Sequence, residues 1–204
     1  MKKTGDSSLS VMEHFFTIQG EGFFQGKAAY FIRLGGCTVG CSWCDVKESW
    51  DAAAHPKLSI TEIVDFVIEE NAKIAVITGG EPAMYDLTDL TKQLKENNIR
   101  THIETSGAFP IIGNFDFITL SPKRFKLPLV QSLQMANELK IVINHTNDFR
   151  WAENFVAQVS PDCKLYLQPE WEQEDELLPQ IINYVKQNQH WQISLQVHKY
   201  MNIP

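Results

Sequence analysis

The chain has 204 residues, of which 44% are hydrophobic, and this length and composition suit one globular domain over residues 1–204. Its net charge of −7 argues against direct binding of nucleic acid, because phosphate contacts need a basic surface. No apolar window of about 18 residues is present and no apolar run follows Lys2 and Lys3, so we expect neither a membrane span nor a secretory signal, and predict a cytoplasmic protein.

Strand-like runs alternate with helical patterns along the chain, which is typical of a parallel sheet with crossover helices. The predicted strands are 28–34, 73–78, 101–104, 115–120, 138–144 and 164–168, followed by a strand-like run over 192–197. About six parallel strands fall short of the eight in a complete barrel. The sequence therefore predicts an α/β fold, an incomplete TIM-type barrel with reduced outer helices.

Helical periodicity appears between these strands. Residues 59–62 form a capping box, which predicts a helix start. The side chains predicted to face the core from this helix are Ile60, Ile63, Val64, Val67 and Ile68. A second helix is predicted from about Asp86, with Leu87, Leu90 and Leu94 inward, and a last one with Leu177, Leu178, Ile181, Ile182 and Val185 inward. We interpret the acidic run over 170–176 as a solvated loop and helix start.

Three of the four cysteines, Cys37, Cys41 and Cys44, form a C-x3-C-x2-C loop after the first predicted strand. Such clustering favours a metal site in a reducing compartment over a disulfide framework. A structural zinc takes four ligands and an ordinary four-iron cluster takes four thiolates. Three thiolates on a cubane would leave one iron open to bind a substrate or cofactor, although a zinc or redox-thiol site remains an alternative. We interpret the distant Cys163 as a small structural residue.

A second motif, Gly79-Gly80-Glu81-Pro82, follows the second predicted strand. The two glycines allow close backbone approach to a ligand, and the carboxylate suits a ligand ammonium group. Taken alone, the segment is better explained as an ordinary turn between a strand and a helix, but the cysteine loop before it favours a ligand site.

Polar motifs recur where the predicted strands end. They are the cysteine loop and residues 79–82, 104–107, 121–123 and 168–169. Because the carboxyl ends of parallel strands meet at one rim of a barrel, these motifs predict one shared active site.

The cysteine spacing, with Trp43 just before the last cysteine, resembles the signature of the radical S-adenosylmethionine (SAM) enzymes, and residues 79–82 resemble their G-G-E-P motif. The resemblance implies a [4Fe-4S] cluster on Cys37, Cys41 and Cys44, whose open iron binds SAM. In that family the reduced cluster splits SAM into methionine and a 5′-deoxyadenosyl radical, which takes a hydrogen atom from the substrate.

Further segments resemble the branch of that superfamily that makes 7-carboxy-7-deazaguanine for queuosine, a modified nucleoside of tRNA. They are residues 16–22, 31–34, 44–45, 104–107, 121–123, 167–169 and 196–204, so the resemblance runs from about residue 12 to the C-terminus. It implies a ring contraction of 6-carboxy-5,6,7,8-tetrahydropterin with loss of ammonia, in which SAM is regenerated. The rival predictions are another small radical SAM enzyme, such as a glycyl-radical activating enzyme, and a non-catalytic metal-binding module.

The resemblance also assigns residues, all of which position cofactor or substrate. The residues implied for SAM are Gly79, Gly80, Glu81, Ser106, Gly107, Ser121, Pro122, Lys123, Gln168, Pro169, Glu170 and Trp171. Those implied for the substrate are Ile18, Gln19, Gly20, Glu21, Arg33, Thr105, His198 and Pro204. Taken alone, Arg33 is equally a surface strand residue and Glu21 a turn carboxylate.

One position departs from the pattern. The family has a threonine that contributes to a magnesium ion, whereas this chain has Val46, which has no oxygen to offer a hard cation. Either Asp45 holds Mg²⁺ together with water and substrate, or the enzyme works without it. The resemblance further implies a homodimer and an electron donor of the flavodoxin or ferredoxin type.

Overall fold

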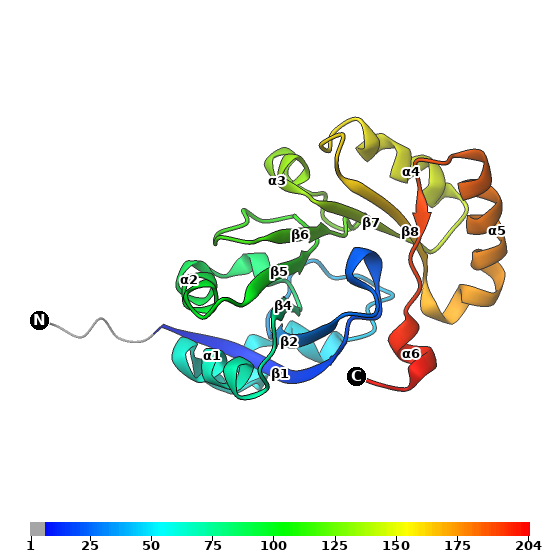
Figure 1. The fold of residues 1–204 in the computed structure, drawn as a ribbon. Coiled ribbons are helices and arrows are strands. Elements are labelled where there is room, and N and C mark those ends of the chain that lie inside the picture. The colour runs from blue at the N-terminus through cyan, green and yellow to red at the C-terminus, as the bar shows by residue number, and fades with distance from the viewer. Residues whose placement is uncertain (1–6) are drawn as a thin grey trace, which may run out of the picture.

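One curved sheet of nine strands runs through residues 7–204, the part of the chain that the computed structural model describes (Figure 1). Its order is β3-β1-β2-β4-β5-β6-β7-β8-β9, with every neighbouring pair from β2 to β9 parallel. The strands are β1 (Ser8–Ile18), β2 (Ala28–Leu34), β3 (Lys57–Ser59), β4 (Ile74–Gly79), β5 (Arg100–Thr105), β6 (Phe117–Leu120), β7 (Glu138–Ile143), β8 (Lys164–Pro169) and β9 (Gln192–Ile193). Lys2 and Lys3, which entered the prediction of a cytoplasmic protein, lie outside the described residues.

The six predicted parallel strands are confirmed as β2, β4, β5, β6, β7 and β8, and the partial barrel is confirmed with them. The sequence did not reveal β1 and β3, which extend the sheet in antiparallel pairing. A register shift between Val11 and Glu13 interrupts the pairing of β1 with β2. Such a bulge breaks the two-residue period by which a strand is recognised.

The longer helices lie outside the curve of the sheet (Figure 1). They are α1 (Ile60–Glu69), α2 (Thr88–Glu96), α3 (Val130–Met135), α4 (Asn147–Val156) and α5 (Glu174–Gln187). The short last helix, α6 (Val197–Met201), lies beside the start of α5, where the Tyr200 hydroxyl donates to Glu174, and brings the chain end near β1 (Figure 1). Of the helices in residues 7–204, none combines the length and apolarity needed to cross a membrane.

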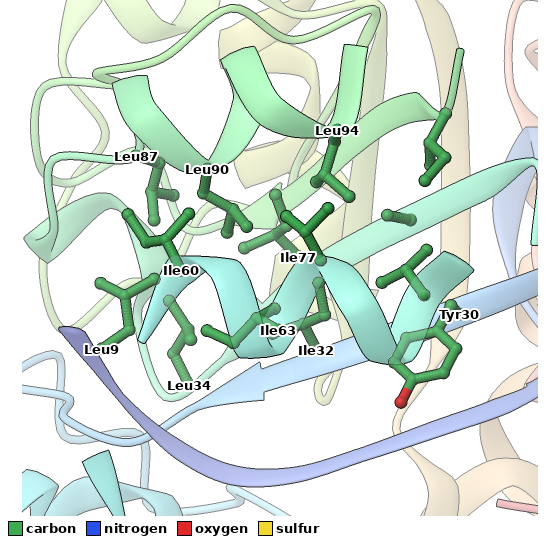
Figure 2. Packing of buried hydrophobic residues seen from close by; sticks show 14 of the residues in the cluster. Leu9, Tyr30, Ile32, Leu34, Ile60, Ile63, Ile77, Leu87, Leu90 and Leu94 are labelled. Carbon is green, nitrogen blue, oxygen red and sulfur yellow. The ribbon is translucent and has the colours of Figure 1, made fainter. Parts of the chain in front are cut away.

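Two apolar clusters fill the space between the sheet and the outer helices. In the first, Ile32 and Ile77 of the sheet gather with Ile63, Leu90 and Leu94 of the two helices that cover them (Figure 2). The second lies under α3, α4 and α5 and contains the buried Cys163, which confirms a structural interpretation of that residue.

The capping box at the start of α1 is confirmed: Ser59 Oγ accepts a hydrogen bond from the Glu62 amide at 3.2 Å, and the Glu62 carboxylate accepts one from the Ser59 amide at 2.8 Å. The prediction that Ile68 and Ile182 face the core is wrong, because their exposed fractions are 44% and 36%. Each follows a buried residue, and the turn of about 100° per residue carries the side chain past the edge of the apolar stripe.

Side chains alternate between the two faces of each strand. On β7, Leu139, Ile141 and Ile143 join the outer apolar cluster, whereas Glu138 and Lys140 point to the inside of the barrel. The barrel interior is therefore polar, although its strands are buried on both faces.

Candidate active site

A cavity of about 580 Å³ opens at the carboxyl ends of the parallel strands. The predicted site residues on its wall are Ile18, Gln19, Gly20, Glu21, Arg33, Cys37, Cys41, Cys44, Asp45, Gly79, Gly80, Glu81, Thr105, Ser106, Ser121, Lys123, Gln168, Pro169, Glu170, Trp171, His198 and Pro204. Segments far apart in the sequence thus meet at one place, as the strand-end argument predicts.

Two predicted SAM contacts, Gly107 and Pro122, lie outside this wall. Gly107 has a φ of +73°, and a Cβ there would stand 2.4 Å from Leu120 Cδ1. The positive φ, together with this close contact, therefore explains the glycine, which lies behind the wall. Pro122 is buried and does not border the cavity.

The cysteine loop places three thiols on the cavity wall. The Cys37 amide donates to the Trp50 carbonyl at 3.1 Å, and the Cys44 amide donates to the Cys41 carbonyl at 3.2 Å, so the loop is held by its own backbone. Burial raises the pKa of the Cys41 thiol to about 11, against a smaller opposing effect of Lys123. Bonding to a metal would supply the charge that keeps such a thiol deprotonated.

The donors on this side of the cavity fit an iron–sulfur cluster. All three cysteines are free, and the buried Trp50 Nε1, also on the wall, has no hydrogen-bond partner within residues 7–204. Its N–H could donate to a sulfur of a bound cluster. No three Cys, His, Asp or Glu side chains of the described chain are grouped tightly enough to hold a single metal ion. A cubane does not need such a group, because each thiolate binds a different iron.

Gly79 and Gly80 lock the end of β4 against the cysteine loop. A Cβ at Gly79, whose φ is +141°, would lie 2.2 Å from the Leu34 carbonyl oxygen, and one at Gly80 would lie 2.5 Å from that of Gly36. The amides of Gly80 and Glu81 donate to the same two carbonyls, each at 2.9 Å. The close approach that these glycines permit is thus to the protein's own backbone, while both also border the cavity.

The Glu81 carboxylate joins the ends of β4 and β5. It is 1% exposed and accepts hydrogen bonds from both the amide and the hydroxyl of Ser106, from the Thr105 hydroxyl, and from the Ala83 amide. Glu81 therefore fixes the two residues that follow β5, in addition to bordering the cavity.

A buried cation, Lys140, sits between two carboxylates at the inner end of the cavity. Its ammonium forms an ion pair with Glu21 and a second one with Glu104, 3.3 Å from Nζ to Oε2. Gln19 joins the group, because its Nε2 donates to Glu104 at 2.8 Å and its Oε1 accepts from the Glu21 amide at 3.0 Å. Gln196 donates to the other oxygen of Glu21 at 2.9 Å.

The ion pairs decide the charge of these groups. Burial would raise the pKa of Glu21, but the charge and hydrogen bond of Lys140, together with the hydrogen bond from Gln196, outweigh burial and the pKa falls to about 2. The pKa of Glu104 is also lowered, by Lys140 against burial, and that of Lys140 is raised by the two carboxylates despite burial. Glu138 lies deeper, and there burial dominates and raises its pKa to about 7.

Other predicted residues line the flanks of the cavity. Arg33 Nε pairs with Glu13 at 2.6 Å, and the stacked rings of Phe15 and Phe31 form an apolar strip beside it. On the opposite flank the Lys123 ammonium donates to Ser121 at 2.7 Å and lies 5.0 Å from the Trp43 ring centroid.

The C-terminal segment borders the cavity through Gln196, His198, Lys199 and Pro204. The Val197 amide donates to the Gly20 carbonyl at 3.0 Å, and a Cβ at Gly20 would stand 2.2 Å from His198 Nδ1, so only glycine fits there. Lys199 Nζ lies 3.5 Å from Asp45 Oδ2 and 4.7 Å from the Trp171 ring centroid. The helix α6 therefore rests on both the cysteine loop and the segment after β8.

Some wall residues were not predicted from the sequence. They include Lys140, Asn144, Gln173, Gln196, Lys199, Trp50, Phe15 and Phe31. For Lys140 a signal was present, since a charged residue in the middle of a predicted central strand needs a partner. The 170–176 run was correctly interpreted as a loop and helix start, but Gln173 within it donates to Asn144 at 2.5 Å and turns into the cavity.

Comparison with known proteins gives consistent results. A sequence profile of the Radical SAM superfamily matches residues 31–120. The chain is 52% identical to 7-carboxy-7-deazaguanine synthase of Flavobacterium psychrophilum, over 96% of this chain and 93% of the relative. It is 47% identical to the enzyme of that name from Synechocystis sp., over 96% and 94% of the two chains.

A solved structure agrees in fold. The chain resembles the crystal structure of QueE from Escherichia coli with a TM-score of 0.79 and 31% sequence identity, covering 92% of this chain and 93% of the other. The agreement extends over nearly the whole length of both proteins.

Proposed function

The chain belongs to the 7-carboxy-7-deazaguanine synthase family within the radical SAM superfamily, and we propose a division of its cavity into a cofactor side and a substrate side. The enzyme forms 7-carboxy-7-deazaguanine in queuosine biosynthesis, by contraction of the ring of 6-carboxy-5,6,7,8-tetrahydropterin with loss of ammonia. The rival predictions, a glycyl-radical activating enzyme and a non-catalytic metal module, have no support from these relatives.

On the cofactor side, Cys37, Cys41 and Cys44 would hold a [4Fe-4S] cluster, and Trp50 would donate to one of its sulfurs. With SAM bound, this group supplies one-electron reduction and the radical that takes a hydrogen atom from the substrate. The chain's own part is to leave one iron without a protein ligand and to shield the site. The packing of Gly79 and Gly80 against residues 34–37 holds the start of the cysteine loop at the wall of the cavity.

SAM would lie between the cysteine loop and the segments after β4, β5, β6 and β8. Glu81 acts in this assignment chiefly by fixing Thr105 and Ser106, since its oxygens already accept four hydrogen bonds from the protein. The remaining residues assigned to SAM are Ser121, Lys123, Gln168, Pro169, Glu170 and Trp171, all on the wall.

The substrate side is the end that carries Glu21 and Arg33. An ionised carboxylate is a strong acceptor for the paired N–H donors of an aminopyrimidinone ring. Glu21, with the Gln19 amide beside it, would accept hydrogen bonds from these donors. The Arg33 guanidinium would bind the substrate carboxylate, because its planar fork matches that group. Ile18, Gly20, Thr105, His198 and Pro204 would complete the pterin pocket, with α6 keeping out water.

Magnesium fits this chain poorly. Val46 offers no oxygen, and the carboxylate of Asp45 faces the Lys199 ammonium at 3.5 Å. A divalent cation prefers several oxygen ligands and is repelled by a neighbouring ammonium. We therefore assign Asp45 to the contact with Lys199 of α6.

The assembly and the electron supply are also proposals. Two exposed apolar residues, Leu127 just before α3 and Val130 at its first position, are 62% and 61% exposed and offer a surface that a second copy could cover in a homodimer. A flavodoxin or ferredoxin-type protein would deliver the electron. The free cysteines and the single continuous sheet support a cytoplasmic protein with one radical SAM domain over residues 1–204.

The observation that carries the assignment is that the cysteine loop, the segment 79–81 and the Glu21–Lys140–Glu104 group all border one cavity. The test is anaerobic reconstitution followed by incubation with SAM, a reductant and the carboxy-tetrahydropterin. We expect a brown protein with about four irons per chain and 7-carboxy-7-deazaguanine by mass spectrometry. A colourless protein with bound zinc, or cleavage of SAM without this product, would contradict the assignment.

A further inference from the structure

We propose that Lys140 is a positioning residue for pterin recognition, which keeps Glu21 charged and aimed into the cavity. The inference rests on the proposed function, because it concerns the carboxylate assigned to the substrate. Lys140 lies in the middle of β7, far in sequence from every predicted site residue that it orders.

The geometry sets Lys140 behind Glu21 and Gln19. Its side chain is 5% exposed, and it pairs with Glu21 directly and with Glu104 at 3.3 Å. Glu104 in turn accepts from Gln19 Nε2 at 2.8 Å, and Gln19 Oε1 accepts from the Glu21 amide. One ammonium thereby fixes both side chains that would receive the N–H donors of the pterin.

The charges explain why a cation is needed there. Glu21, Glu104 and Glu138 face Lys140 from three different elements, and His102, Lys123 and His198 are the other titratable groups around them. Burial alone favours the protonated acid, as Glu138 demonstrates with its pKa of about 7. Without Lys140, burial would raise the pKa of Glu21, and a protonated carboxyl offers fewer acceptor sites to the N–H donors of a ligand.

The alternative is a purely structural ion pair, which would stabilise the barrel interior without affecting recognition. The two differ in pH dependence. A structural role predicts that Lys140→Met changes the amount of folded enzyme but leaves KM of that enzyme with the same pH profile. A positioning role predicts that KM rises as the pH falls through the raised pKa of Glu21, while kcat changes little.

The experiment measures KM for the carboxy-tetrahydropterin between about pH 6.5 and 8.5 in reconstituted wild-type and Lys140→Met enzyme. The ratio of the two KM values cancels the titration of the substrate and of groups common to both. We expect this ratio to increase about tenfold from the upper to the lower end of that range. Lys140→Arg should restore a flat ratio, because it keeps the positive charge.

A double variant covers the case in which Lys140→Met does not fold. Lys140→Met with Glu104→Gln removes one positive and one negative charge, so the net charge of the group is preserved, and Glu21 still lacks its counterion. The same rise of the KM ratio is expected. Lys95→Met, which breaks an outer ion pair with Asp116 of 2.8 Å, is the matched control and should give a flat ratio.

A flat KM ratio in either folded variant would overturn the inference. Failure of the proposed function has a different signature, because wild-type enzyme would then form no 7-carboxy-7-deazaguanine at any pH. The pH profile thus separates the role of Lys140 from the identity of the reaction.

Discussion

The two faces of the same strands do different work in this protein. The outer face of β2, β4, β5, β7 and β8 carries Ile, Leu and Ala side chains that pack under the helices in two apolar clusters. The inner face carries Arg33, Thr78, Glu104, Lys140 and Gln168, all on the cavity wall. Successive residues on one strand therefore alternate between the outer face, which contributes to stability, and the inner face, which lines the cavity.

The comparison extends to the cysteines. Cys163 lies in the outer cluster, whereas Cys37, Cys41 and Cys44 lie on the cavity wall. Identical side chains thus have roles set by the face they reach. A free cysteine among apolar residues behaves as a small hydrophobe, and only the loop on the cavity wall is placed to bind iron.

The largest expected effect follows from this contrast. Cys37→Ala, Cys41→Ala or Cys44→Ala should each abolish cluster assembly and SAM cleavage, measured by iron content and by formation of 5′-deoxyadenosine. Cys163→Ala should retain the iron and cost about 1 kcal/mol of unfolding free energy. Loss of iron from Cys163→Ala would contradict the assignment of Cys163 to the apolar cluster and of the other three cysteines to the iron.

Removing the C-terminal residues that cover the cavity should have the next largest effect on activity. Deleting residues 201–204 removes the contact between the Thr17 hydroxyl and the Pro204 carbonyl oxygen, 3.3 Å apart, and opens the substrate side. We expect KM to rise by at least about tenfold, a loss of roughly 1.4 kcal/mol of binding, while the cluster still assembles.

The rival role for this segment is a dimer contact. In that case light scattering would show a change of oligomeric state while KM kept its wild-type value. A truncated dimer with unchanged KM would contradict the proposed cover.

Two buried carboxylates of the barrel interior, Glu138 and Glu21, should affect the free energy of unfolding with opposite pH dependence. The pKa of Glu138 is raised to about 7, so its contribution to stability is complete below pH 4.5 and is lost as the pH rises to about 7. The pKa of Glu21 is lowered to about 2, so its contribution is present above pH 4.5 and is lost as the pH falls toward 2. Both directions follow from proton linkage.

We expect Glu138→Gln to remove the loss of stability that wild type shows as the pH rises from 4.5 to about 7. Relative to wild type, the variant should gain on the order of 2–3 kcal/mol of unfolding free energy between about pH 4.5 and 7, measured by urea unfolding of the apoprotein. A stability difference that does not vary across this interval would show that Glu138 is not held protonated by burial.

Magnesium should have the smallest effect. Because Lys199 already faces Asp45 and Val46 supplies no oxygen, removal of Mg²⁺ by a chelator should change wild-type kcat/KM by less than about twofold. Val46→Thr combined with Lys199→Met should make the activity depend on Mg²⁺ and should produce a Mg²⁺-dependent shift in Tm. A strict Mg²⁺ requirement in the wild type would show that other oxygens complete a site.

Much of this arrangement could be predicted from the sequence, because spacing and strand ends are local signals. The cysteine loop, the segment 79–82 and the six parallel strands were found in this way. The bulged β1 was missed since the bulge hides the two-residue period. The apolar stripe of α1 ends one residue before Ile68, which its periodicity alone does not reveal.

The partners within the site were harder to predict. That Lys140 meets Glu21 depends on the curvature of the whole sheet, because the two are 119 positions apart. That Gly79 and Gly80 pack on the backbone of residues 34–36 depends on the register of β2 with β4. Sequence patterns indicate that such residues need a partner, but three-dimensional contacts decide which one they find.

Two neighbours on β7 provide the most direct test. Ile141 is 0% exposed in the outer cluster, and Lys140 is on the inner face. Ile141→Ala should cost roughly 2–5 kcal/mol of unfolding free energy and leave kcat/KM within about twofold of wild type where the protein is folded. Lys140→Met should lower kcat/KM for the pterin in the folded enzyme, most strongly at low pH. Equal losses of kcat/KM in the two folded variants would contradict the separation of stability and function between the faces.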